Sequence, residues 1–565
     1  MPRRRLLYAL LGSGLLVASA ATWAYWPSAA KTSGPFASAQ ASGTRLHVRI
    51  FDGTTRTLMP GLVSFRGADK QMVAFGNFAD LPGWAQGRSA VELDPEAGLL
   101  AFRHGMAVWR GEATIPVGAP WSHLDVGGQT PVQSELVPGI YEVIVSRGAT
   151  YDTATYTVDL REGKGRVTLD ATLVRTVDTT GYVSADVHVH NAPESPDAHA
   201  NAEQQLKVAA VNGLDVLVST NHGVLVDLAP VVAKLWKGQH PIQVVTGNEQ
   251  AGPNSHFGVF PLPLDPGKPG RGAPVVRPFP LEVFFQDLRA LEGRPVVVAN
   301  HPRLGWQAYM DEGFCGGWAR KDFGAPPPCP QSYDAFEVLN GWQTCGTRMR
   351  DATDTWLALL SYNAISAPVG GSDSHYVSAM VPGYPRTWVR LGDGDSDSPM
   401  PTRLAEALRA RRTIASTAPF VTLRSGTASE GQLVTHTDDT VPVRVRVQAP
   451  NWVPVDTVRL LVNGTPVKTW NLARAGRALD FTTDEALTLD RQDAFVTVET
   501  DSQVPLPPHL TGEEDAVVQY GLSRCAPRPG QAPGTPAFAV TSPLFVDRDG
   551  DGLFKGPRAT TPIKI

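Results

Sequence analysis

The sequence predicts a multidomain protein in which a central α/β domain lies between two β-sandwich domains. At 565 residues the chain is long enough for about three or four domains. Short alternating segments, split by Gly and Pro, predict strands at both ends of the chain. Between them helix-like and strand-like segments alternate, which is typical of a parallel sheet built from βα units. We therefore expect four segments, which are 1–40, 41–178, 179–420 and 421–565.

The segment 1–40 has the pattern of an export signal. Arg3, Arg4 and Arg5 precede an apolar run that extends from Leu6 to about Trp26. Two interpretations stay open, because the run approaches membrane-spanning length while Ser28-Ala29-Ala30 offers a small-residue cleavage site. We expect an exported protein that is periplasmic, extracellular or membrane-anchored, and that meets a membrane only through this segment.

The two flanking segments are predicted to be β-sandwiches. In 41–178, "FDGTTRTLMPGLVSFRG" followed by "LVPGIYEVIVSRG" resembles the transthyretin-like modules of secreted enzymes. In 421–565, Asn463-Gly464 fits the tight turn of a hairpin.

An acidic turn near the end of the chain has the spacing of a calcium loop. Its aspartates alternate as calcium ligands do, although Arg558 stands where such a loop carries its bidentate Glu. A calcium site and a solvated acidic turn therefore both stay open. The aspartates are Asp547, Asp549 and Asp551.

Charge and cysteine content narrow the functional classes. The net charge of -5 offers no basic excess to neutralise phosphates, so we expect no nucleic-acid partner. In an oxidising compartment Cys315 and Cys329, which bracket a Gly/Pro-rich loop, are expected to form a disulfide. Cys345 and Cys525 either pair or stay free.

Polar side chains gather in the segment "SADVHVHNAPESPDAHAN" and at the ends of the central strand-like runs. His188 and His190 alternate with Val187 and Val189, so both imidazoles point to the same face of a strand. Because βα loops converge at one edge of a parallel sheet, residues at successive strand ends meet there. The further residues of this kind are Asp197, His222, Glu249, His256, His301, Asp373 and His375.

Each of these residues has an ordinary structural explanation when taken alone. His222 could cap a helix, Asp373 could be an N-cap, and His301 could be a loop residue before proline. Taken together, strand ends that carry imidazoles and carboxylates point to metal ions, which bind neutral His and ionised Asp or Glu.

The motifs "DVHVHNAPESPD", "STNHG", "GNE", "NHP" and "GGSDSH" resemble, in that order, those of the PHP (polymerase and histidinol phosphatase) metal-dependent hydrolases. The resemblance is strongest to their exported branch with flanking β-domains, and it covers roughly 181–418. It implies a distorted (β/α)7 barrel that holds two or three divalent metal ions (Zn, Mn or Fe).

The resemblance also implies a set of ligands for each metal. His188, His190, Glu249 and Asp373 would hold one metal, and Glu249 would bridge to a second metal bound by His256 and His301. The third metal would be held by Asp197, His222 and His375.

Two positions depart from the family's pattern. Asn221 stands where the family usually has Asp, so a supporting charge near His222 is missing. The loop after His190 is one residue longer than usual, which leaves open whether Asp197 or His199 reaches the metal. We expect Asp197.

The implied chemistry is hydrolysis by a metal-bound hydroxide, with no Ser or Cys nucleophile. We expect Glu249, Asp373 and Arg303 to carry catalysis. Arg303 would stabilise an anionic group in the transition state, and an ordinary surface arginine is the alternative that stays open. A phosphoesterase is the first hypothesis and a carbamate, amide or ester hydrolase the second. A non-catalytic surface protein that binds metal or glycan is the third.

Overall fold

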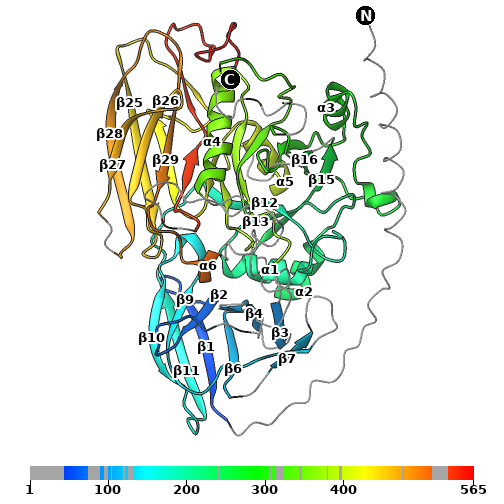
Figure 1. The fold of residues 1–565 in the computed structure, drawn as a ribbon, viewed down its shortest axis with the longest axis vertical. Helices are drawn as coiled ribbons and strands as arrows, with labels where there is room; N and C mark the ends of the chain where they lie inside the picture. Colours follow the sequence, from blue (N-terminus) through cyan, green and yellow to red (C-terminus); the bar gives the residue numbers. More distant parts are fainter. Residues whose placement is uncertain are drawn as a thin grey trace, which may run out of the picture. The chain divides into compact units, whose positions relative to one another are not determined.

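The computed structural model describes residues 43–565 with gaps (Figure 1). The gaps are 74, 76–89, 95–98, 103–104, 119–120, 125–130, 240, 253–254, 305–307, 312–314, 316–317, 319–323, 343–345, 378–379, 393–397, 474–475, 512–531 and 533. The predicted export signal, Cys345 and Cys525 lie outside the described residues. Within the described part, no helix has the length and apolar character needed to cross a membrane.

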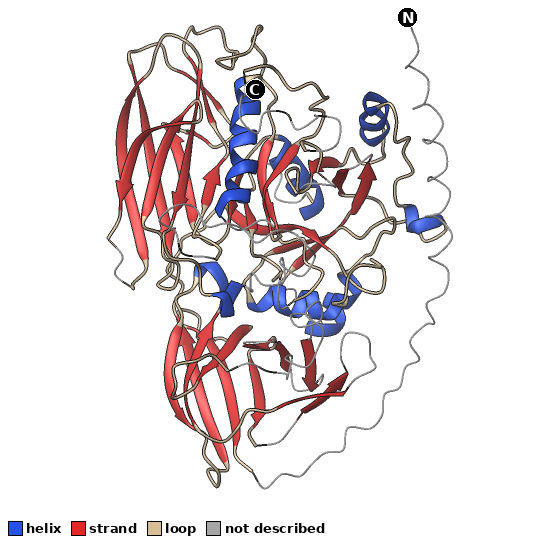
Figure 2. Ribbon diagram, in the orientation of Figure 1, coloured by secondary structure: helices blue, strands red, loops and turns tan. Residues whose placement is uncertain are grey.

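The protein is multidomain and consists mostly of strands, with helices that accompany its middle region (Figure 2). In its first described region, a three-stranded sheet β11-β1-β6 and a six-stranded sheet β10-β9-β2-β5-β4-β3 pack on one hydrophobic core. On β1, Leu46, Val48 and Ile50 alternate toward this core, as the period of a strand requires. The strands are β1 (Arg45–Asp52), β2 (Gly61–Arg66), β3 (Ala90–Asp94), β4 (Leu99–Phe102), β5 (Gly105–Val108), β6 (Glu112–Pro116), β9 (Ile140–Ser146), β10 (Ala154–Asp159) and β11 (Arg166–Leu173), with a hairpin of β7 (Trp121–Leu124) and β8 (Pro131–Ser134).

The middle region alternates strands and helices, as the sequence pattern predicts. Its strands are β12 (Tyr182–Val189), β13 (Val216–Ser219), β14 (Gln243–Thr246), β15 (Asn248–Gly252), β16 (Ser255–Phe260), β17 (Val296–Ala299), β18 (Ala335–Asn340), β19 (Ala367–Gly371), β20 (Arg386–Arg390) and β21 (Thr413–Ser416). Its helices are α1 (Ala202–Val211), α2 (Ala229–Trp236), α3 (Leu281–Arg289), α4 (Gly346–Ser361) and α5 (Met400–Arg409). Helix α1 begins with a capping box, in which Asn201 and Gln204 bond each other's backbone N–H.

These strands form two sheets rather than one closed barrel, within the residues that the structure describes. Strands β12, β13 and β14 are parallel, and so are β17, β18 and β19, but β15 and β16 form an antiparallel hairpin. The two sheets share a hydrophobic core. They meet through two isolated bridges, Val189 with Ser374 and His222 with Glu249, and both bridges include or adjoin predicted metal ligands.

The last region is again made of strands, and it continues a sheet of the middle region. Strand β21 pairs with β30, so one sheet runs across the predicted boundary at residue 420. A second sheet has the order β23-β22-β25-β28. The elements are β22 (Phe420–Ser425), β23 (Ala428–Ser429), β24 (Leu433–Thr435), β25 (Thr440–Ala449), β26 (Thr457–Val462), β27 (Thr465–Asn471), β28 (Leu479–Thr488), β29 (Ala494–Asp501), α6 (Pro508–Thr511), β30 (Ala539–Thr541) and β31 (Leu544–Asp547).

Candidate metal centre

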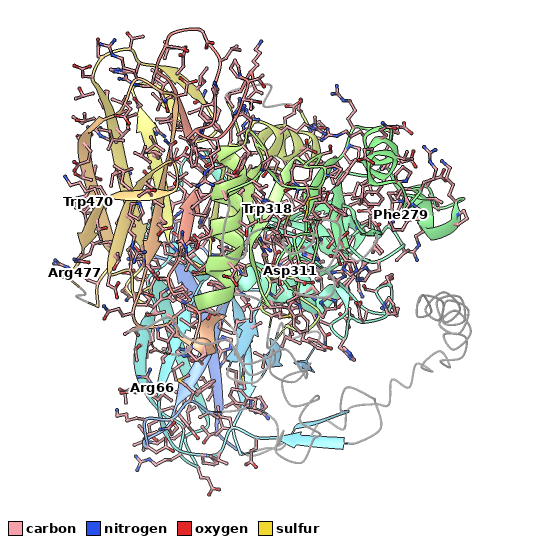
Figure 3. All side chains as sticks on the ribbon, turned by 45° about the horizontal axis from the view of Figure 1, so that its top comes forward. Arg66, Phe279, Asp311, Trp318, Trp470 and Arg477 are labelled. Atoms are coloured by element: carbon pink, nitrogen blue, oxygen red, sulfur yellow. A yellow bond between two sulfur atoms is a disulfide. The ribbon has the colours of Figure 1, made fainter. Side chains whose placement is uncertain are left out.

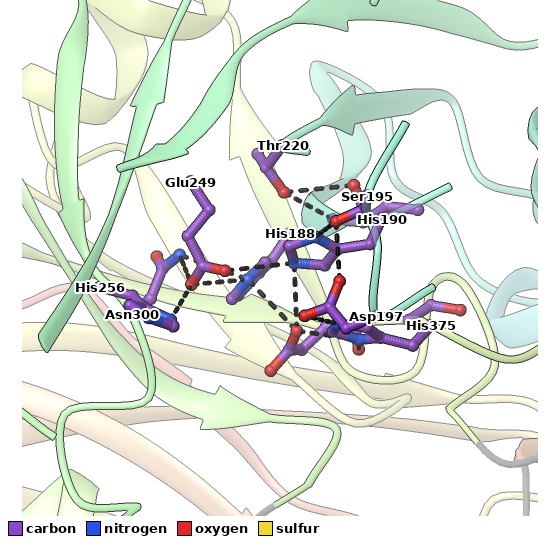
Figure 4. A network of polar contacts seen from close by, with 12 residues as sticks. His188, His190, Ser195, Asp197, Thr220, Glu249, His256, Asn300 and His375 are labelled. Atoms are coloured by element: carbon purple, nitrogen blue, oxygen red, sulfur yellow. Dashed lines mark hydrogen bonds and ion pairs between the residues drawn. The ribbon is translucent and has the colours of Figure 1, made fainter. Parts of the chain in front are cut away.

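The fold brings all nine predicted ligands together at the edge where the two central sheets meet. Figure 4 labels His188, His190, Asp197, Glu249, His256 and His375 among them. His188 belongs to β12, Glu249 to β15 and His256 to β16, while the others lie in loops that follow strands. Four overlapping groups of these side chains place ligand atoms close enough to share an ion. The groups are His190, Asp197, His222 and His375; His188, His190 and Glu249; His188, His301 and Asp373; and His222, Glu249 and His256.

Glu249 lies at the centre of the cluster. Its two carboxylate oxygens lie within 3.4 Å of ring nitrogens of five histidines. The contacts are His188 (3.1 Å), His256 (3.4 Å) and His301 (3.2 Å) at Oε1, and His190 (3.3 Å) and His222 (3.3 Å) at Oε2. Glu249 therefore contacts histidines from all three of the predicted ligand sets.

The cluster has a buried side and an open side. Asp373 Oδ1 lies 3.3 Å from His188 Nε2 and 3.4 Å from His190 Nε2, and both of these histidines are fully buried. By contrast the side chain of Asp197 is 49% exposed and that of His222 23% exposed. Among the nine described ligand candidates, Asp197 and His222 are thus markedly more exposed than the fully buried His188 and His190, so a substrate can approach from their side.

Of the two residues that could reach a metal from this loop, Asp197 and His199, the structure brings Asp197 into the cluster. Asp197 Oδ2 lies 3.2 Å from His222 Nε2 and 3.3 Å from His375 Nε2, so it belongs to the cluster. His199 instead stacks its ring on Tyr376, at 4.8 Å between centroids. The geometry thus places Asp197 in the position that we expected for it.

Sequence reasoning missed the buried groups that orient the ligands. Glu337, on β18, lies 3.0 Å from His188 Nδ1 through Oε1, and its Oε2 accepts hydrogen bonds from the His301 backbone N–H and from Asn340 Nδ2. Asn300 Nδ2 donates to Glu249 Oε1 at 2.8 Å. These contacts leave His188 Nε2 facing the centre of the cluster, as in the carboxylate–histidine pairs that support metal sites.

The second imidazole of the opening motif is held from the loop that follows it. Ser195 Oγ lies 3.1 Å from His190 Nδ1 and donates to Asp197 Oδ1 at 2.9 Å. The Nε2 atom of His190 is buried and has no hydrogen-bond partner among the described residues. A buried nitrogen aimed at carboxylates but without a hydrogen bond fits a position for a cation, and we take this as evidence that the donor set suits divalent metals.

Two of the ligand positions have backbone conformations that are unusual for residues other than glycine. His301 has φ 29° and Asp373 has φ 52°. Such strain occurs often at functional sites, where the surroundings hold it in place. Gly371 shows how closely the chain packs here, because a Cβ atom at this position would lie 2.6 Å from the Cβ of His188 and 2.7 Å from Glu337 Oε1.

The electrostatics of the cluster keep its carboxylates ionised. Burial alone would raise the pKa of Glu249, but the histidines around it, His188 and His256 foremost, hold that pKa well below its usual range. Burial alone would lower the pKa of His190, but its contacts with Asp373 and Glu249 outweigh burial and raise the pKa to about 9. The cluster therefore holds an ionised Glu249 beside histidines such as His190, whose pKa the neighbouring carboxylates raise.

Asn221 has a structural role away from the histidine that follows it. Its Oδ1 accepts from the Asn191 backbone N–H at 2.8 Å, and its Nδ2 donates to Asn191 Oδ1 and Ser219 Oγ. No carboxylate therefore supports His222 from this position, in agreement with the departure noted in the sequence.

The structure does not support the predicted catalytic role of Arg303. Its guanidinium is buried, and every nitrogen donates to a protein oxygen, including Asp311 Oδ1 at 3.0 Å and the Trp318 backbone oxygen at 2.7 Å. Figure 3 labels Asp311 and Trp318, which lie in the middle region. An arginine whose three nitrogens all bond protein oxygens in this way holds a loop together, so we correct its assignment from catalysis to structure.

The carboxylates that lie together at the acidic turn differ from the predicted calcium ligands in one residue. Asp547 and Asp549 lie close together, but the third carboxylate of their group is Asp493, whose own sequence context gave no signal. Asp551 instead accepts a hydrogen bond from the Leu553 backbone N–H at 2.8 Å. The predicted calcium set of Asp547, Asp549 and Asp551 is therefore not the group that the fold assembles.

The predicted disulfide is confirmed. Cys315 and Cys329 are joined, with their Cα atoms 5.1 Å apart. Most of the loop between them lies outside the described residues.

Comparisons with known proteins add little to the geometry. No family model matches the chain, and no curated protein matches it. A two-domain protein from Bacteroides vulgatus, described as containing a predicted PHP-like metal-dependent phosphoesterase, aligns with 16% identity over 57% of this chain and 92% of its own, at a TM-score of 0.32. A pilus-presented adhesin aligns with 12% identity over 23% of this chain and 26% of its own, at a TM-score of 0.10. Similarities at such TM-scores do not establish a shared fold.

Replacing Glu337 with Gln should weaken metal binding by about 10–100-fold, the usual effect of losing an outer-shell partner. The amide can accept from the His301 N–H or from His188 Nδ1–H, but it cannot serve all three of the contacts that Glu337 makes. Metal titration of the purified variant measures the effect. Glu282→Gln, at an exposed position of α3, is the matched control and should bind metal as the original protein does. Equal metal affinity in both variants would show that Glu337 does not orient the ligands.

Proposed function

We propose that the protein is a metal-dependent hydrolase. The observation that carries the proposal is the contact of one carboxylate, Glu249, with five histidines at a partly open sheet edge. The buried Nε2 of His190, which lacks a hydrogen bond, supports it. We also propose, from the motifs, that 179–420 is a PHP-like domain whose two sheets correspond to a distorted barrel.

We propose that three sets of residues hold the metals. From the motif resemblance, His188, His190, Glu249 and Asp373 would hold the buried ion, and Glu249 with His256 and His301 would hold the second. The fold groups His256 with His222 and Glu249, and His301 with His188 and Asp373. Asp197, His222 and His375 would hold the third, on the exposed side. When bound, divalent metals polarise the scissile group and lower the pKa of a coordinated water.

The chain's own residues prepare this chemistry. Glu249 and Asp373 stay ionised, since the neighbouring histidines outweigh the effect of burial on the pKa of each. Glu337 and Ser195 hold His188 and His190 by their Nδ1 atoms, so that both Nε2 atoms face the carboxylates. The ligands are thus oriented before any substrate arrives, which reduces the cost of assembling the site.

The substrate class rests on fewer observations than the metal site. A phosphate site usually needs several cationic side chains, but Arg303 is engaged with Asp311, and Arg350 is engaged with Asp354 and Glu499. We keep a phosphoesterase as the first proposal on the motif resemblance. A carbamate, amide or ester hydrolase is the second proposal, and the pairing of these two arginines with carboxylates is the observation that supports it. We further propose that the protein is exported, as its N-terminal pattern indicates.

The purified protein should contain about two or three divalent metal ions per chain, because nine ligands at three to four per ion provide for that number. Elemental analysis after gentle purification, and again after incubation with Mn, Fe or Zn, measures the content. A content below about one ion per chain after reconstitution would contradict the hydrolase proposal and favour a non-catalytic surface protein.

The metal-loaded protein should hydrolyse at least one of three activated substrates, namely an aryl phosphomonoester, an aryl phosphodiester and an aryl carbamate. An aryl oxide leaves readily, so hydrolysis should be visible even when the substrate fits poorly. Chelator-treated protein is the control and should be inactive. Reaction with the carbamate alone would select the second substrate class, and no reaction with any substrate would contradict an enzymatic role.

A further inference from the structure

A second site lies on the last region of the chain, in a pocket of about 390 Å³. One face of the sheet β22-β25-β28 forms most of its wall, and the chain that leads into β12 completes it. The opposite face of the same strands carries core residues such as Val421 and Val445. We call this site the arginine pocket. Its lining includes Arg424, Arg444, Arg446, Thr422, Thr482 and Tyr182.

The arginine pocket is separate from the metal centre. Tyr182 begins β12, whereas His188 lies six residues further along the same strand. At a rise of about 3.3 Å per residue the two positions are roughly 20 Å apart. A small ligand cannot contact both sites at once.

Two of its arginines are held rigidly by carboxylates. Arg444 donates to both oxygens of Asp484 at 2.7 and 2.8 Å. Arg446 donates to both oxygens of Asp480 at 2.9 and 2.8 Å. Its Nη1 also lies 3.6 Å from Oδ2 of Asp178, a further carboxylate that lines the pocket. Bidentate pairs fix the plane of each guanidinium. The strand face therefore offers donors and acceptors side by side at fixed spacing, which suits the hydroxyl groups of a sugar, since a hydroxyl both donates and accepts.

The third arginine has no such carboxylate. Arg424 is exposed, and among the described residues no acidic side chain pairs with it. It also lies directly opposite Arg444 in the register of β22 and β25. Like charges in opposite positions destabilise a sheet, so an anionic group between or above them would be favourable. The positive charge of Arg424 thus favours a ligand that carries one negative group.

The remaining wall fits a polar ligand of small size. Thr422 and Thr482 bring hydroxyl groups to the face, and the ring of Tyr182 packs edge-on against Phe420 with centroids 5.0 Å apart. Tyr182 Oη donates to the buried Glu430 at 2.9 Å, so the hydroxyl of this tyrosine is already engaged. The volume lies at the lower end of the range for small-molecule sites, about 300–1,000 Å³.

We propose that the arginine pocket binds a sugar acid, with its carboxylate at Arg424 and its hydroxyl groups against the paired Arg444 and Arg446. This binding is independent of the proposed hydrolytic reaction. It would give the last region a carbohydrate-recognition role that the metal centre does not supply.

Calorimetric titration of the full chain tests the proposal, with D-glucuronate, D-galacturonate, D-glucose and sodium sulfate as probes. Chelator-treated protein is used, so that the probe carboxylates cannot report binding to metal. We expect saturable binding of at least one of the two sugar acids, and binding of glucose or sulfate that is at least about tenfold weaker, which is the loss of one interaction of about 1.4 kcal/mol.

Arg424→Gln should weaken the binding of the sugar acid at least about tenfold. Arg166→Gln is the matched control, because Arg166 is an exposed strand arginine that also faces another arginine, Arg45, in register but lies outside the pocket. The control should bind as the original protein does. Failure of both sugar acids to bind, equal binding of sulfate, or equal losses in the two variants would overturn the proposal. None of these outcomes bears on the hydrolase proposal, which the metal content and the ester panel test.

Discussion

Replacing Glu249 with Gln should lower the hydrolytic rate by more than about 100-fold, because even the outer-shell partners of a metal site are worth about 10–100-fold. Glu249 is the one carboxylate of the cluster whose two oxygens together contact five histidines. An amide keeps the shape of the side chain but removes the negative charge that would lie between two cations. The loss should therefore exceed that of any substitution outside the ligand set.

The measurements are the rate on whichever ester the original protein hydrolyses and the metal content of the same preparation. The variant should retain its fold, since the hydrophobic core beneath the site is unchanged. Gln250→Ala is the control, because the next residue on a strand points to the opposite face and is only partly buried here. A normal rate and a normal metal content in Glu249→Gln would show that this carboxylate is not a bridge.

The meeting of the nine candidate ligands could be predicted from the sequence, because most of them lie in or just after strand-like runs. In the segment that contains His188 and His190, the alternation of polar and apolar residues predicts that both imidazoles lie on one face of the strand. The ends of parallel strands then converge at one edge of the sheet. The nine side chains therefore met as expected, although they extend over nearly two hundred residues of sequence. A local pattern was sufficient here, because the convergence of parallel strand ends at one edge predicts which residues distant in sequence lie together.

The supporting groups could not be predicted in this way. Glu337 stands in the middle of the run "AFEVLN", where a lone carboxylate carries no signal, and its partner His188 is 149 positions away. The hairpin of β15 and β16 was likewise hidden, since the sequence between Glu249 and His256 gave no signal that their two strands pair. The pairing of β21 with β30 joins segments more than a hundred residues apart, so the continuity of that sheet across residue 420 had no local signature.

Arg303 illustrates an error of a different kind. A cation directly after a proposed ligand suggested contact with substrate, because sequence order was taken as nearness to the reacting atoms. The structure turns the side chain away into a buried network, where it pairs with Asp311 and bonds the backbone oxygens of Met310 and Trp318. Because Arg303 follows His301 closely in sequence, its Cα atom must lie near that histidine. The direction and burial of its side chain depend instead on the loops that pack around it.

Replacing Arg303 with Met should therefore destabilise the protein rather than impair the reaction of the folded molecules. The side chains of Arg303 and Asp311 are only 2% and 1% exposed, and removing one partner of a buried ion pair costs about 3–5 kcal/mol, since the remaining buried charge loses that pairing. Denaturant unfolding should show this loss, and the kcat/KM of the remaining folded protein should be unchanged.

The double variant Arg303→Met/Asp311→Leu separates the two explanations for Arg303. If the cost of the single variant comes from the stranded carboxylate, removing that carboxylate should restore part of the lost stability, because apolar replacements of buried pairs are often tolerated. Restoration would not be expected if Arg303 acted on substrate, since the second substitution returns no cation to the site. A single variant with unchanged unfolding but a reduced kcat/KM would return Arg303 to the catalytic role that its position in the sequence first suggested.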